Sequence, residues 1–347
     1  MDGGNGAGGG IYNVGALALT GCTVSANIAF YAGGVYNGGT TALTDCTVSG
    51  NNAYASVNGN SGAGAGLYND GGLMLTGCVV SGNASFGGSA DNGGPGGSGG
   101  GLYSAGTLTL TGCTVSGNYA GPNANGLGGL GGGLDNQGTA MLTGDIFYGD
   151  YAANVAEIAN DTFDSPSATV TASYCDIQGS RASSTNFGPA ILDVDPRFVS
   201  APTDLHLQGD SPCIGRGVAD SADATDRDGN LRPNPPSIGA YEHTSVGLAS
   251  LTFPSPVAGG TVVRATVTLA GVMPTDTLVG LSSSDSSVVH VHRAVIVPAG
   301  ASSATFTIKT YPSPITKMVT IRATLGQVVV TGPGQVVVTA PLTITGR

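Results

Sequence analysis

Apolar and polar residues alternate along short stretches of the first half of the chain. In the stretch LALTGCTV, Leu17 and Leu19 fall on one side, and Cys22 and Val24 continue the alternation after a Thr-Gly pair. A period of two is typical of β-strands, and Thr-Gly or Gly-Asn pairs are typical of turns. The pattern therefore predicts short strands joined by tight corners.

The alternating stretches recur as a twenty-residue frame without internal insertions. The frame covers residues 8–27, 32–51, 64–83, 99–118 and 131–150, and gaps of 4, 12, 15 and 12 residues separate the copies. A unit of about 24 residues with three short strands cannot bury its apolar side alone, whereas stacked units can. We therefore expect a β-solenoid over residues 8–180, with strands pairing in parallel between coils about 4.8 Å apart.

Stacking turns each frame position into a column, and the Leu, Val and Cys columns are expected to fill the interior. The cysteine column consists of Cys22, Cys46, Cys78 and Cys113, and Asp145 takes the fifth place. The asparagine column consists of Asn27, Asn51, Asn83 and Asn118, followed by Asp150. We expect these amides at a corner, in a conformation that Asn tolerates, bonded along the solenoid axis. The variable gaps should leave from this corner, and the Gly-Gly-Gly runs predict a bend without room for side chains.

The cysteine column is best explained as small apolar filling of the interior. Disulfides between adjacent coils are a geometric alternative, since neighbouring Cα atoms would lie near the lower part of the allowed range. Zinc is disfavoured because no second Cys-x-x-Cys pair and no nearby His accompany these residues.

Composition and charge support an all-β protein. The chain of 347 residues has 60 glycines, no tryptophan and a net charge of −11. Its apolar residues recur at set positions and charge is scarce, which argues against disorder. Residues 1–180 hold eleven acidic residues and no Lys or Arg, so nucleic acid is an unsuitable partner. No apolar run is long enough for a transmembrane segment.

The repeats resemble a known group of proteins. The combination of VSGN, a loop and GGGLY is similar to the repeats of polymorphic outer membrane proteins and, more broadly, to bacterial surface proteins with right-handed parallel β-helices. The resemblance implies an extracellular or cell-surface setting, associated with the outer membrane. The start MDGGNGAGGG lacks the features of a signal peptide, and we expect the natural protein to begin upstream of it.

A second resemblance covers the segment after the repeats, residues 181–245. Between residues 193 and 242 the chain has an Asp-Pro-x-Phe start, an Asp-x-Asp-Gly loop and an Ile-Gly-Ala-Tyr-Glu end. This pattern resembles the segment that closes many bacterial parallel β-helix proteins, both surface proteins of the choice-of-anchor type and some polysaccharide lyases. We expect the segment to cover the exposed end of the solenoid, where strand edges would otherwise be unpaired.

The pattern of apolar and polar residues changes again at residue 246. Residues 246–347 read as about seven alternating strands with turn signals every 8–12 residues, which predicts a β-sandwich. The stretch VPAGASSATFTI resembles Ig-like modules of bacterial surface proteins, which implies a spacer role. The expected organisation is a parallel β-helix over residues 1–245 followed by an Ig-like β-sandwich.

The loop DATDRDGN is a candidate calcium site. Oxygen ligands at alternate positions suit Ca²⁺, and the candidates here are Asp223, Asp226, Asp228 and Asn230. The alternative is a turn whose Asp side chains bond backbone N–H groups and pair with Arg227 or Arg232.

A catalytic site has few candidates. Glycosidases need two carboxylates, and the last coils offer only Asp145, Asp150, Asp161 and Asp164. The alternative is a frayed last coil with solvated Asp residues. A lyase of the β-helix type would also need a Lys or Arg base on the coils, which have none before Arg181.

The sequence therefore favours a non-enzymatic extracellular or cell-surface protein. We expect adhesion, or binding of a polysaccharide or another surface protein, through the solenoid face and its loops. The alternative is a polysaccharide lyase or glycoside hydrolase. Among the loop aromatics, only Tyr54, Phe86 and Tyr119 are available for stacking on sugars.

Overall fold

The chain forms two compact all-β units, residues 1–243 and 244–347. The structure is a computed structural model, and every element in its described part is a strand, as expected. It describes residues 8–55, 62–88, 96–123, 125, 128–154, 157–160, 165–180, 187–218, 225–230, 232–243, 247–269, 271, 276–325 and 337–345. In this part no helix has the length and apolar character needed to cross a membrane.

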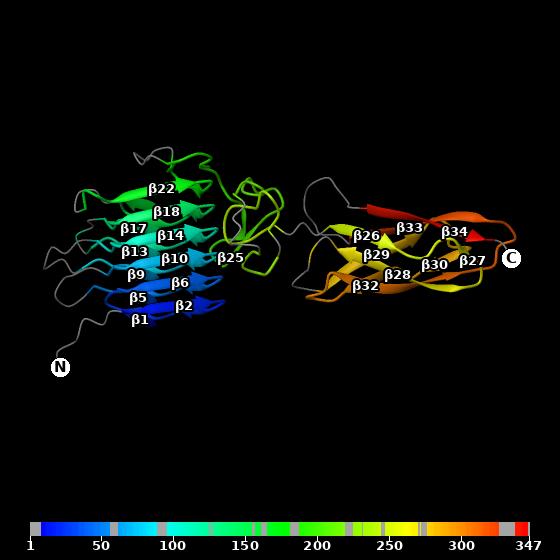
Figure 1. The fold of residues 1–347 in the computed structure, drawn as a ribbon, viewed down its shortest axis with the longest axis horizontal. Coiled ribbons are helices and arrows are strands. Elements are labelled where there is room, and N and C mark those ends of the chain that lie inside the picture. Colours follow the sequence, from blue (N-terminus) through cyan, green and yellow to red (C-terminus); the bar gives the residue numbers. More distant parts are fainter. Residues whose placement is uncertain are drawn as a thin grey trace. The chain divides into compact units, whose positions relative to one another are not determined.

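The first unit is a parallel β-solenoid, in which each coil adds one strand to each sheet (Figure 1). The first sheet consists of β1 (Ile11–Asn13), β5 (Val35–Asn37), β9 (Leu67–Asn69), β13 (Leu102–Ser104), β17 (Leu134–Asn136) and β21 (Ile158–Asn160). The second sheet consists of β2 (Ala16–Thr20), β6 (Thr40–Thr44), β10 (Gly72–Thr76), β14 (Thr107–Thr111), β18 (Thr139–Thr143) and β22 (Thr169–Ser173).

Two further sheets complete each coil. The third sheet consists of β3 (Thr23–Ser25), β7 (Thr47–Ser49), β11 (Val79–Ser81), β15 (Thr114–Ser116), β19 (Ile146–Tyr148) and β23 (Asp176–Ile177). The fourth sheet consists of β4 (Ile28–Ala29), β8 (Asn52–Ala53), β12 (Ala84–Ser85), β16 (Tyr119–Ala120) and β20 (Tyr151–Ala152).

The expectation of three strands per coil is therefore wrong. After each column asparagine the chain stays extended for two more residues, which pair with the same residues of the next coil. The variable loops consequently leave after this fourth strand and not at the asparagine corner. The two added residues were assigned to the gap because they lie outside the twenty-residue frame.

The register of the strands follows the frame. Val35 lies beside Leu67, Leu43 beside Leu75, and Val48 beside Val80. These residues and their equivalents form one buried cluster through the solenoid. The predicted interior of Leu, Val and Cys columns is confirmed.

Glycines shape two bends of each coil. A Cβ atom on Gly34 would lie 2.4 Å from the carbonyl oxygen of Gly66, so the third position of the Gly-Gly-Gly bend has no room for a side chain, whereas Ala32 and Ala65 show that the first two positions can hold a methyl group. At the asparagine corner, the left-handed residue is the one before the asparagine, such as Gly50 with φ of 63° or Gly82 with φ of 62°. The asparagine itself was expected there, but its amide is needed for the ladder described below.

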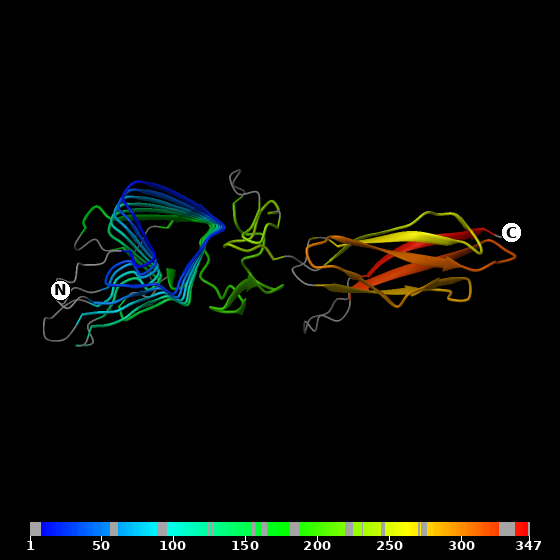
Figure 2. The same ribbon diagram turned by 90° about the horizontal axis from the view of Figure 1, so that it is seen from below.

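The segment after the repeats does not sit over the end of the solenoid as a whole, which corrects the expectation. Residues 187–192 lie against the last coil, where Leu192 N–H donates to the carbonyl of Cys175 at 2.8 Å. The rest, including the antiparallel pair β24 (Phe198–Ser200) and β25 (Asp204–Leu207), packs beside the coils (Figure 2). Its apolar side chains join Val79 and Ile146 of the third sheet in a second buried cluster. These two outward-facing residues are apolar and need a cover, which explains the position.

The second unit is a β-sandwich, as predicted. One sheet has the order β26 (Leu248–Thr252), β28 (Val262–Leu269), β32 (Ser303–Thr310) and β30 (Val289–Val291). The other has the order β27 (Val257–Ala258), β34 (Val337–Thr345), β33 (Lys317–Leu325), β29 (Thr277–Ser283) and β31 (Ala294–Val297). Neighbouring strands are antiparallel except β27 and β34, and apolar side chains from both sheets form one core.

Candidate functional site

The cysteine column lies inside the solenoid, and all six cysteines of the chain are free thiols. Each sulfur bonds within the stack: Cys46 Sγ accepts from the backbone N–H of Cys22 at 3.4 Å and donates to the carbonyl of Thr44 at 3.2 Å. A bond to Cys78, together with burial, raises the pKa of Cys46 far above its usual value. These neutral, inward thiols fill space and are unsuited to metal binding or nucleophilic attack.

Asp145 occupies the fifth place of the cysteine column and is fully buried. Its Oδ1 accepts the backbone N–H of Cys113 at 2.7 Å, and its Oδ2 accepts that of Thr143 at 2.8 Å. Burial raises the pKa of Asp145 to about 8, although the two N–H bonds act in the opposite direction. The carboxyl thus accepts the N–H of the preceding coil as a column cysteine does, but it also accepts the N–H of Thr143, where a cysteine donates to the carbonyl two residues before it.

The asparagine column forms a continuous side-chain ladder at its corner. The amide nitrogen of Asn51 donates to Oδ1 of Asn83 at 3.0 Å, and Asn83 donates in the same way to Asn118 at 2.9 Å. Asn118 donates to Oδ1 of Asp150 at 2.8 Å. A carboxylate cannot pass on a donor, so the ladder ends at Asp150.

Asp150 lies next to Glu157 in the interior. The backbone N–H of Asp150 donates to Oε1 of Glu157 at 3.3 Å, and each side chain is only 5% exposed. Burial and the neighbouring negative charge raise the pKa of Glu157, and burial raises the pKa of Asp150 by a smaller amount. Of the two carboxyls, Glu157 therefore keeps its proton to the higher pH.

The burial of these carboxyls determines whether a substrate could reach the candidate catalytic residues. Asp145 and Asp150 face the interior, where a polysaccharide cannot reach them, so they do not form an acid/base pair on the surface. Asp161 and Asp164 lie outside the described residues. An inward direction of Asp145 was indicated by its place in the cysteine column, which continues to Cys175, whereas Asp150 ends the asparagine ladder.

The candidate calcium loop is organised around Asp226, which is 1% exposed. Its two oxygens accept N–H groups of Asp228 at 3.0 Å, Asn230 at 2.7 Å and Glu242 at 2.8 Å. Asp223 lies outside the described residues, and the described ones contain no group of three or more His, Cys, Asp or Glu side chains suited to a metal. The calcium site stays a prediction, and the contacts of Asp226 match the alternative of a self-bonded turn.

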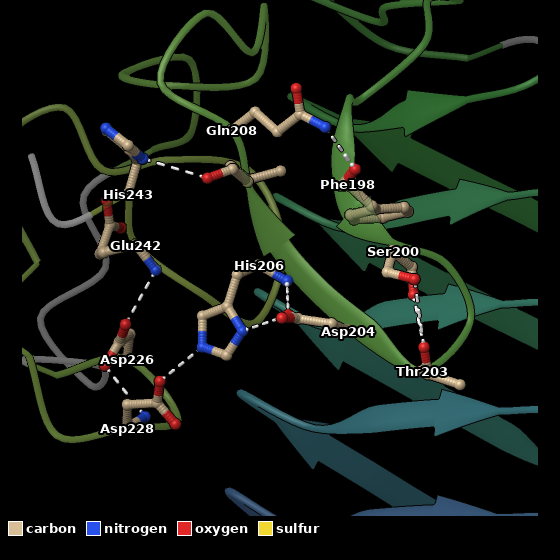
Figure 3. Close-up of polar contacts among 11 residues, drawn as sticks. Phe198, Ser200, Thr203, Asp204, His206, Gln208, Asp226, Asp228, Glu242 and His243 are labelled. Carbon is tan, nitrogen blue, oxygen red and sulfur yellow. Dashed lines mark hydrogen bonds and ion pairs between the residues drawn. The ribbon is translucent and has the colours of Figure 1, made fainter. Parts of the chain in front are cut away.

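His206 joins this loop to β25 (Figure 3). Its Nδ1 lies 2.6 Å from Oδ1 of Asp204 and its Nε2 lies 2.7 Å from Oδ2 of Asp228. Burial lowers the pKa of His206, but the two carboxylates outweigh it and raise the pKa above its usual value. Both ring nitrogens are engaged by carboxylates, so this histidine has no nitrogen left to activate a hydroxyl. We call His206 with its contacts to Asp204 and Asp228, which join β25 to the loop, the clasp.

The outer face of the first sheet carries a column that the sequence interpretation missed. We call Tyr12, Tyr36, Tyr68 and Tyr103 the tyrosine column. Successive rings stack with centroids 4.9, 5.4 and 4.6 Å apart. Tyr12 is 58% exposed, and the hydroxyl of Tyr36 donates to Oδ2 of Asp70 at 2.9 Å. The signal was present in the residue after Ile11, Val35, Leu67 and Leu102, which period two places outward.

A second aromatic column follows the fourth sheet. It contains the three loop aromatics named from the sequence together with Tyr151. Tyr54 and Phe86 stack at 4.8 Å, Phe86 and Tyr119 lie 6.2 Å apart, and Tyr119 and Tyr151 stack at 5.4 Å. The solenoid therefore has two rows of aromatic side chains on different outer faces.

Comparisons with known proteins assign no family to the chain. No protein family and no curated protein sequence matches it. Among solved structures, WR4, an MSP family member from C. elegans, is similar over 28% of this chain and 97% of its own, at 14% identity and a TM-score of 0.19. A likeness this weak carries no argument about fold or function.

Proposed function

We propose that this chain is a non-enzymatic extracellular or cell-surface protein that binds a neutral glycan through the outer faces of its solenoid. The observation that carries the proposal is the tyrosine column, a row of stacked, partly exposed rings on a rigid sheet. Aromatic rings with a polar end are typical of surfaces that contact a ligand, because they combine apolar area with little side-chain entropy. The resemblance of the repeats to bacterial surface proteins supports the setting, and the β-sandwich would act as a spacer.

Charge selects the class of glycan. Residues 1–180 contain eleven acidic residues and no Lys or Arg, so an acidic polysaccharide would be repelled and would find no cationic partner. A neutral glycan, or an uncharged patch of another surface protein, meets no such barrier. The loops after the fourth sheet vary in length and would adjust the contact without disturbing the coils.

The alternative of a polysaccharide lyase or hydrolase has no supporting observation in the described residues. The two described candidate carboxylates are buried, as shown above, and His206 is held between two carboxylates. A screen for product release from neutral and acidic polysaccharides still tests this alternative directly.

The binding proposal is tested by affinity electrophoresis of the full chain through gels that contain soluble neutral or acidic polysaccharides. We expect retardation by at least one neutral polymer and by no acidic one. The double variant Tyr36→Ala/Tyr68→Ala should weaken that binding by about tenfold, as expected for aromatic contact residues. Met141→Ala, which truncates an exposed side chain on the second sheet, where no aromatic residue lies, is the control and should bind normally. Absence of retardation by every polymer, or equal binding by the double variant, would refute the proposal.

A further inference from the structure

The outer face of the second sheet has a composition unlike the rest of the solenoid. Three positions on each of its six strands point outward, and none of them is charged or aromatic. Most of the positions are threonine: Thr20, Thr40, Thr44, Thr76, Thr107, Thr109, Thr111, Thr139, Thr143, Thr169 and Thr171. The others are Ala16, Ala18, Ala42, Gly72, Met74, Met141 and Ser173. We call this surface the threonine face.

The threonine face is flat and regular. Its strands stack in order along the solenoid (Figure 1) and pair in parallel over all five residues without a bulge, so equivalent residues stand in straight rows. Rows repeat every ~4.8 Å between strands and every ~6.6 Å along a strand, because alternate residues share a face. Six strands of five residues make a surface on the order of 400 Å². This is a two-dimensional lattice of side chains.

The hydroxyl groups of this face are available to a ligand. Within the described part of the chain, none of these threonines uses its Oγ1 in a hydrogen bond to the protein. By contrast, the inward Thr41 of the same sheet donates to Oδ1 of Asn37 at 2.9 Å. Branching at Cβ restricts each threonine to few rotamers, so its methyl and hydroxyl groups hold set positions.

We propose that the threonine face binds ice. A crystal of ice is an uncharged, periodic array of donors and acceptors, and each threonine hydroxyl can act as either. The ~4.8 Å repeat between strands is close to a repeat of the water oxygens in hexagonal ice. The charge of the molecule fits this partner, because the face has no ion whose hydration shell would have to be removed although the chain has a net charge of −11.

Other partners fit the threonine face less well. A protein partner is favoured by buried aromatic, Arg or large apolar anchors, and here only Met74 and Met141 are large. A sugar is favoured by aromatic rings, which lie on the first and fourth sheets instead. This inference goes beyond the proposed glycan binding and uses a different surface.

The test is partition of the full chain into a slowly growing ice hemisphere, together with thermal hysteresis, in buffer without glycan. We expect the wild type to enter the ice and Thr109→Arg, in the middle of the face, to reduce entry by about tenfold. Tyr151→Arg places the same charge on the fourth sheet and serves as the control. Met141→Thr, which makes all three outward positions of β18 threonine, should increase hysteresis.

The outcomes separate cleanly. Exclusion of the wild type from ice, or equal entry of wild type and Thr109→Arg, overturns the proposal, provided that circular dichroism shows both folded. Loss of adsorption to microcrystalline chitin or cellulose, instead of to ice, in Thr109→Arg would assign the face to a glycan lattice and also overturn it. The Tyr36→Ala/Tyr68→Ala variant should keep ice binding, so failure of the glycan proposal and of this one are distinguishable.

Discussion

Replacing Asp145 with cysteine should remove a large part of the pH dependence of solenoid stability. The equivalent residues of the other coils show that cysteine fits the place, since Cys46 Sγ accepts a column N–H and donates to a nearby carbonyl. The substitution Asp145→Cys therefore keeps an acceptor for the N–H of Cys113 and removes the buried carboxyl. In the wild type, Cys175 Sγ accepts the backbone N–H of residue 145 at 3.4 Å, and the substitution leaves this backbone donor in place.

The magnitude follows from the pKa of Asp145. Burial raises this pKa from 3.8 to about 8, so the folded state holds a proton that the unfolded state releases above pH 4. The folded state then binds more protons than the unfolded state between pH 4 and 8, and stability falls as pH rises through this window. At about 1.4 kcal/mol per pH unit, the carboxyl costs roughly 5 kcal/mol by pH 8. Asp145→Cys should therefore be more stable than wild type at pH 8 and closer to it, or less stable, at pH 4.

Urea denaturation from pH 4 to pH 8, followed by tyrosine fluorescence, measures the difference. The chain has 12 tyrosines, of which only Tyr311 lies in the β-sandwich, and no tryptophan, so the signal reports the solenoid. Asp150, Glu157 and Asp176 are also buried with raised pKa values, and they contribute the same slope to both proteins. The difference between wild type and variant isolates Asp145. Parallel stability curves for the two proteins over this range would refute the reasoning.

Three further substitutions test other parts of the solenoid. Asn83→Ala removes the acceptor of Asn51 and two donated hydrogen bonds, and should lower the free energy of unfolding by about 3 kcal/mol in urea titrations. Gly34→Ala forces a Cβ atom against a backbone carbonyl and should cost about 3 kcal/mol or more, whereas Gly21→Ala, with open space around it, should cost about 1 kcal/mol; equal melting temperatures would contradict this. Asp228→Asn should lower the pKa of His206 in an NMR titration, and with it the stability that the clasp adds at pH values below that pKa. An unchanged imidazole titration would argue against the clasp.

The columns of the solenoid could be predicted because parallel, in-register stacking places equal frame positions side by side. Cys22 and Cys46, or Asn51 and Asn83, needed only an alignment of the sequence with itself. The same logic would have found the tyrosine column, but the outward residue after Ile11 was not considered as part of a surface. The inward and outward residues of a short strand repeat with the same regularity. The repeat alone therefore does not show which set of residues forms an exposed surface.

Contacts outside the repeat could not be predicted in this way. His206 meets Asp228, which lies 22 positions later in the sequence, and no period links them. The position of the closing segment had a hint in Val79 and Ile146, which are apolar at outward positions where the first coils have threonine. That hint indicates a covered face, but only the folded chain shows which segment covers it.

The direction of the asparagine ladder has a consequence for how such a protein can change length. Every amide from Asn27 to Asn118 donates toward the C-terminal coil, so any coil with asparagine at this corner can follow any other. Asp150 accepts a hydrogen bond from Asn118 but has no side-chain donor of its own, so the ladder does not continue beyond it. A gene could therefore gain or lose whole coils upstream of residue 131 by in-frame duplication or deletion with the ladder intact. A coil with asparagine at this corner inserted after Asp150 would receive no donor from Asp150, so the ladder allows extension upstream of this residue and not directly after it.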